Sequence, residues 1–92
     1  MKRLIATLVI LGVGGLGLAQ SGPKVFISID MEGITGVTHW EDVSRSGKDY
    51  DMFRKIMTQE ANAAVEGALG AGASEIWVRD SHGSARNILP EL

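Results

Sequence analysis

Hydrophobic and polar positions divide the chain after residue 23 into two short apolar runs separated by a polar connection and a periodic stretch. In residues 24–30, β-branched and aromatic side chains occupy successive positions and so fill both faces of an extended segment. This pattern predicts a strand buried on both sides in a parallel sheet. Residues 75–79 predict a second short strand, in which Trp77 would pack in a core or an interface.

Between the two runs, residues 51–69 predict a helix, because apolar side chains recur there every three or four positions. Asp49 or Asp51 can cap its amino end, and Gly70 and Gly72 can end it. The expected buried face consists of Phe53, Ile56, Met57, Ala61, Ala64, Val65, Ala68 and Leu69.

Residues 34–48 show no clear period and predict a long loop, held down by Val37, Trp40 and Val43. Strand, loop, helix and strand in this order make a βαβ unit, whose strands run parallel. Two strands and one helix cannot cover both faces of a sheet. We therefore expect the α/β fold class, as an incomplete part of a three-layer α/β/α domain with a mostly parallel sheet.

The first residues are typical of a secretory signal peptide. Lys2 and Arg3 precede an apolar run, and Gly17-Leu18-Ala19 resembles a cleavage site. We expect a signal peptide over residues 1–19, a linker over 20–23, and an α/β domain over 24–92 that is exported to the periplasm or the extracellular space. The apolar run is short for a membrane span, which needs about 20 residues. We therefore expect no stable membrane insertion after cleavage, although an uncleaved anchor is the alternative.

Composition narrows the possible functions. Without Lys2 and Arg3, seven of the nine basic residues remain against eleven acidic ones, a net charge of −4. The basic residues form no stripe that would indicate nucleic-acid binding. The lack of cysteine excludes thiolate chemistry. A glycine pattern over residues 12–17 matches a dinucleotide-binding fingerprint, but Gly22-Pro23 leaves no room for the helix that such a site requires.

The residues that can carry chemistry follow the two predicted strands. Asp30 and Glu32 come directly after the first, and Asp80 and His82 after the second. Parallel strands end at one edge of a sheet, where α/β domains form ligand sites, so these side chains should converge. Neighbouring carboxylates with an imidazole suit zinc, manganese or iron. Each motif alone also fits a turn cap or a solvated loop; both motifs at one edge favour a metal.

Three other polar residues allow alternative roles. We expect His39 to be a loop residue beside Trp40 rather than part of the site. Asp80 can orient the ring of a metal-bound His82 or cap the turn that follows the strand. Glu60, in the predicted helix, can be solvated or can reach the site.

Residues 28–33, Ser-Ile-Asp-Met-Glu-Gly, resemble the S-x-D-x-E-G signature of the zinc-dependent D-aminopeptidases. Residues 56–62 are similar to the central helix of that family, and residues 80–82 to its second metal motif. The resemblance implies two zinc ions, with Asp30 bridging both, Glu32 on one and His82 on the other. It also implies hydrolysis of amino-terminal D-amino acids from short peptides and assembly into homo-oligomeric rings.

The same resemblance places further metal ligands and the catalytic residue beyond Leu92. We therefore expect this chain to carry part of a metallo-aminopeptidase site and to be inactive alone. Two other functions stay open: a magnesium-dependent phosphoryl-transfer hydrolase using Asp30 and Glu32, and a non-catalytic exported binding module.

Overall fold

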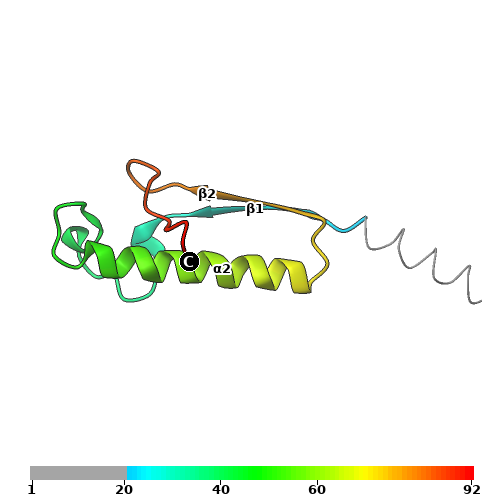
Figure 1. The fold of residues 1–92 in the computed structure, drawn as a ribbon, viewed down its shortest axis with the longest axis horizontal. Coiled ribbons are helices and arrows are strands. Elements are labelled where there is room, and N and C mark those ends of the chain that lie inside the picture. The colour runs from blue at the N-terminus through cyan, green and yellow to red at the C-terminus, as the bar shows by residue number, and fades with distance from the viewer. Residues whose placement is uncertain (1–20) are drawn as a thin grey trace, which may run out of the picture.

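The computed structural model describes residues 21–92, so the predicted signal peptide over residues 1–19 lies outside the described residues. Strand β1 (Lys24–Ile29) and strand β2 (Glu75–Asp80) form a parallel pair. Helix α2 (Tyr50–Gly70) connects them and lies along one face of the pair, as Figure 1 shows. The predicted βαβ unit is confirmed, and the helix extends one residue beyond the predicted range at each end.

The core lies between the sheet, α2 and the loop that follows β1. Alternate residues of β1, beginning with Val25, are less exposed than their neighbours. The helix contributes the first part of its predicted apolar face, whereas Leu69 near its end is 58% exposed. Although Asp49 occupies the N-cap position, its side chain makes no capping hydrogen bond. The buried cluster consists of Met31, Ile34, Val43, Tyr50, Phe53 and Met57.

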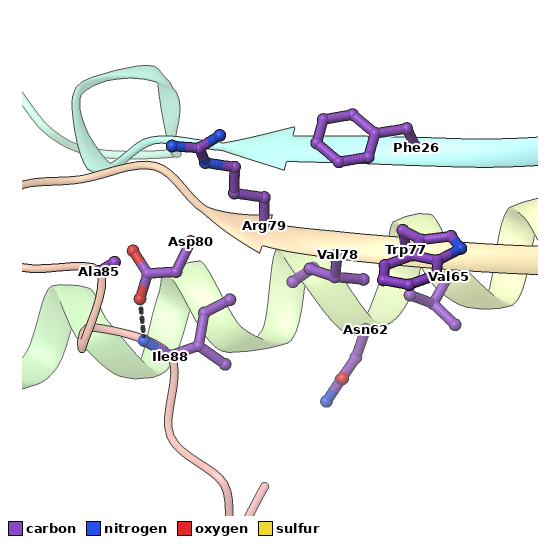
Figure 2. A pocket seen from close by; sticks show the side chains of 10 residues that line it. Phe26, Asn62, Val65, Trp77, Val78, Arg79, Asp80, Ala85 and Ile88 are labelled. Carbon is purple, nitrogen blue, oxygen red and sulfur yellow. Dashed lines mark hydrogen bonds between the residues drawn. The ribbon is translucent and has the colours of Figure 1, made fainter.

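The opposite face of the sheet is open in the described part of the chain. Phe26 pairs with Trp77 in the strand register, and these side chains are 64% and 63% exposed. The prediction of a strand buried on both sides is therefore wrong for this face within residues 21–92, where α2 covers only the other one. Trp77 is likewise not a core residue of the described segment. Figure 2 shows both side chains at a hollow of about 700 Å³ beside β2.

The loop after β1 is built from two short 3₁₀ turns, η1 (Met31–Gly33) and η2 (Trp40–Val43). Val43 is buried as predicted, but Trp40 is 67% exposed, so the expectation that it packs the loop down is wrong. Glu60 reaches this loop from α2, and its Oε1 accepts a hydrogen bond from the Thr35 N–H at 2.9 Å. Within residues 21–92, no helix combines the length and apolar character needed to cross a membrane.

Candidate metal centre

The three predicted ligands meet at the carboxyl edge of the sheet. Asp30 directly follows β1, Glu32 lies in η1, and His82 lies two residues after β2. The Nδ1 atom of His82 is 3.0 Å from Asp30 Oδ1 and 3.1 Å from Glu32 Oε2. One ligand atom from each residue lies within 4.8 Å of the other two. The two strands thus bring together residues that are 50 positions or more apart in sequence.

The other ring nitrogen determines how the His82 imidazole is used. Nε2 lies 2.8 Å from the carbonyl oxygen of Val43, which can only accept a hydrogen bond. Nε2 therefore carries a proton, and this N–H donates a hydrogen bond to the Val43 carbonyl. In the neutral ring, Nδ1 then presents a lone pair toward Asp30 and Glu32. Three acceptors facing one another repel unless a cation lies between them, either a second ring proton or a metal ion.

This donor set fits zinc. Two carboxylate oxygens and one imidazole nitrogen are common zinc ligands, and a backbone carbonyl that accepts from the distal nitrogen is the usual support of a metal-bound histidine. Both carboxylates remain accessible, with side-chain exposures of 55% for Asp30 and 58% for Glu32, whereas the His82 side chain is only 14% exposed. An ion can therefore approach from the carboxylate side while the ring stays fixed.

The electrostatics of the cluster also indicate a site for positive charge. Burial is the largest influence on the His82 pKa and lowers it, but the hydrogen bond to Val43, the charge of Glu32 and the hydrogen bonds with Asp30 and Glu32 together outweigh it. The net effect raises the His82 pKa above 6.5. Hydrogen bonding with Glu32 is the largest influence on the Asp30 pKa, which lies below its usual value, with a further contribution from His82.

Asp80 organises the turn after β2 rather than the His82 ring. Its carboxylate accepts hydrogen bonds from the backbone N–H groups of His82 at 3.3 Å, Asn87 at 2.6 Å and Ile88 at 2.9 Å. Burial is the largest influence on the Asp80 pKa and raises it, but these bonds and one from the Asn87 side chain outweigh burial and lower the pKa. Of the two roles considered from the sequence, the turn cap is the one the structure supports; the Ile88 contact is drawn in Figure 2.

Sequence reasoning missed Asn87, which holds this turn against the helix. Asn87 is 1% exposed, and its Nδ2 donates to Asp80 Oδ1 at 2.8 Å and to the His82 carbonyl at 2.6 Å. Its Oδ1 accepts a hydrogen bond from the Tyr50 hydroxyl, and Arg54 Nε donates to its carbonyl at 2.9 Å. Nothing in the local pattern marks this asparagine, because all its partners except those in its own turn come from a distant helix.

His39 lies outside the metal cluster, as predicted. Its ring packs beside Trp40 with centroids 5.4 Å apart, and its Nδ1 accepts a hydrogen bond from the Glu41 N–H at 3.1 Å. The Asp42 carboxylate in turn accepts a hydrogen bond from the His39 N–H, which completes a capping box at the start of η2. This role was not foreseen, since histidine is not among the preferred N-cap residues.

The fold and the cluster define an α/β domain with a candidate metal site at the carboxyl edge of its strands. The family model described as D-aminopeptidase matches residues 24–92, and the chain belongs to this family. A D-aminopeptidase of Bacillus subtilis (strain 168) is 38% identical over 68 residues, which cover 74% of this chain and 25% of that relative. The chain thus spans about a quarter of the length of the curated relative that it matches. No solved structure matches the chain.

Proposed function

We propose that this chain contributes the metal-binding edge of an exported, zinc-dependent aminopeptidase that acts on short peptides, with the D-amino-acid preference that its family name suggests. Family membership supports the aminopeptidase reaction. The observation that carries the proposal is the convergence of one Asp30 oxygen and one Glu32 oxygen on Nδ1 of His82, at 3.0 Å and 3.1 Å. The signal-peptide pattern of residues 1–19 supports export.

In this proposal Asp30, Glu32 and His82 would hold the zinc. When bound, zinc supplies Lewis acidity, which polarises a peptide carbonyl and lowers the pKa of a water molecule. The chain's own contribution is to position these ligands. The Val43 carbonyl fixes the tautomer of His82, and Asp80 fixes the backbone of the turn that carries it.

The phosphoryl-transfer alternative is less well supported by this geometry. Magnesium prefers oxygen ligands and retains several waters, so an imidazole nitrogen at the centre of the cluster would have no function there. A binding module without a metal would leave three acceptors facing one another in the neutral state of His82.

Calorimetric titration of the chain with zinc tests the metal site. Since three ligands cannot satisfy two ions that each require about four, we expect binding weaker than micromolar and no peptide hydrolysis by this chain alone. His82→Asn should remove most of the zinc binding. His39→Asn is the matched control and should leave it unchanged, because asparagine can still cap η2.

Equal zinc binding by the two asparagine variants would contradict the metal site. Stoichiometric, sub-micromolar binding of two ions would instead contradict the idea that the site is partial. Circular dichroism of both variants should match that of the original chain, which separates loss of a ligand from loss of the fold.

A further inference from the structure

A second feature of the carboxyl edge is a cleft beside Glu32 that the metal cluster does not use. It measures about 250 Å³ and is lined by Glu32, Val37, Thr38, His39 and Trp40. The Trp40 side chain is one of its walls and is 67% exposed. The Trp40 ring thus places a large apolar surface next to a candidate metal ligand, a combination that is typical of ligand sites.

The wall formed by Trp40 stands on a rigid turn. Asp42 Oδ2 accepts hydrogen bonds from the N–H groups of Thr38 and His39, both at 3.0 Å, and the Ser44 hydroxyl donates to the Trp40 carbonyl at 3.0 Å. The ring is therefore presented by backbone that is already ordered. Binding against such a surface avoids much of the entropic cost of ordering a loop.

The same turn is connected to the metal cluster. Val43 ends η2, three residues after Trp40, and is buried with 4% exposure. Its carbonyl accepts the hydrogen bond from His82 Nε2. One short 3₁₀ turn thus carries both the exposed ring and the group that orients a candidate ligand, so the distance between cleft and cluster is fixed by the fold.

The cleft combines apolar walls with a hydrogen-bond donor. Trp40 and Val37 supply the apolar surface. His39 Nδ1 is occupied as an acceptor by the Glu41 N–H, so a neutral His39 ring carries its proton on Nε2, where it can act as a donor. Glu32 belongs both to the lining of this cleft and to the metal cluster.

We propose that this cleft is the subsite for the side chain of the amino-terminal residue of the peptide substrate, and that it prefers a bulky apolar or aromatic side chain. The proposal rests on the proposed function, which places the amine and carbonyl of that residue at the metal cluster. The side chain is attached to the same carbon as the amine and therefore extends into the space next to the metal cluster, which Glu32 borders.

The size and the apolar lining of the cleft determine this preference. An enclosed apolar cavity of about 150 Å³ accepts benzene, so a cleft of about 250 Å³ has room for a benzyl group. A methyl side chain would leave the surfaces of Trp40 and Val37 exposed to water.

Nuclear magnetic resonance of the zinc-loaded chain tests the subsite without requiring catalysis. The chain has two tryptophans, and their indole N–H groups give two signals. Trp77 Nε1 donates a hydrogen bond to the Glu75 carboxylate on β2, and its signal serves as an internal reference. Titration with phenylalaninamide should shift the Trp40 signal and leave the Trp77 signal in place, with a dissociation constant at least about tenfold lower than that of alaninamide. Both enantiomers of each amide should be used.

Matched variants separate this subsite from the metal site. Trp40→Ala should remove the preference for phenylalaninamide, whereas Trp77→Ala should retain it; zinc binding by calorimetry should be unchanged in both. Equal affinity for the two amides, or no binding of either, overturns the subsite. If the original chain does not bind zinc, the proposed function is overturned. If phenylalaninamide is then still preferred without zinc, and this preference depends on Trp40, the result supports the cleft alone.

Discussion

Replacing the buried Asn87 by alanine should destabilise the turn that carries His82, and more than the same replacement of an exposed asparagine does. The substitution removes three side-chain hydrogen bonds, to the Tyr50 hydroxyl, Asp80 Oδ1 and the His82 carbonyl. Asn87 is 1% exposed, so water cannot easily replace the lost partners. Asp80 keeps three backbone donors, and the His82 carbonyl keeps the Ala85 N–H at 2.9 Å, so the Tyr50 hydroxyl is the group that loses its hydrogen-bond partner.

The magnitude follows from one group left without a partner and two other lost hydrogen bonds. A buried Tyr50 hydroxyl without a partner costs roughly 1–3 kcal/mol, and each of the other two lost bonds costs roughly 0.5–1.5 kcal/mol, so we expect a loss of about 3 kcal/mol. A folded segment of this size has a total stability of only about 3–10 kcal/mol, at roughly 0.05–0.15 kcal/mol per residue. The melting temperature should therefore fall by about 10–25 °C.

The assay is thermal and urea unfolding followed by circular dichroism. Asn62→Ala is the matched control, because Asn62 is an exposed residue of α2 whose side chain donates one hydrogen bond, to the Leu92 carbonyl. It should change the stability by less than about 0.5 kcal/mol. If Asn87→Ala does not fold, Tyr50→Phe removes only one of the three bonds and should cost about 1 kcal/mol. Equal unfolding midpoints for the Asn87 and Asn62 variants would refute the reasoning.

Three further predictions concern the loops of the site. Gly47→Ala should destabilise the chain, because the added methyl group would overlap backbone carbonyl oxygens of its own loop, whereas Gly67→Ala, with open space in the helix, should stabilise it by about 1 kcal/mol in the same urea assay. Ala85→Gly should stabilise the turn after β2 by about 1 kcal/mol, since Ala85 has a φ of 58°, while Ala63→Gly in the helix should cost about 1 kcal/mol; a destabilised Ala85 variant would contradict this. Asp42 has a pKa lowered chiefly by the backbone N–H groups that it accepts from, so its contribution to stability is present above pH 3.8 and is lost as the pH falls through the folded-state pKa; Asp42→Asn should lose this acid-side dependence in unfolding curves.

Much of the candidate site could be predicted because it depends on topology. Asp30, Glu32 and His82 follow two strands whose apolar character is visible in the sequence, and parallel strands end at one edge. The helix that forces the strands to be parallel is equally visible from its period. These features require only local patterns and a general rule of connection, so the sequence was sufficient for them.

The parts that were missed depend on contacts between distant segments. The Val43 carbonyl that orients His82 carries no side-chain signal, and Asn87 is an ordinary loop asparagine until α2 packs against it. Trp40 was expected to pack inward because it is large and apolar, but the capping box formed by His39 and Asp42 fixes the turn so that the ring faces outward.

The sequence by itself therefore determined the elements, their order and the residues that meet at the carboxyl edge. Only the tertiary structure decided the tautomer of His82, the role of Asp80 as a turn cap and the position of Trp40 beside Glu32. The physical reason is that hydrophobic periodicity specifies which face of an element is buried, whereas the direction of a hydrogen bond or an exposed ring depends on where another segment places its partner.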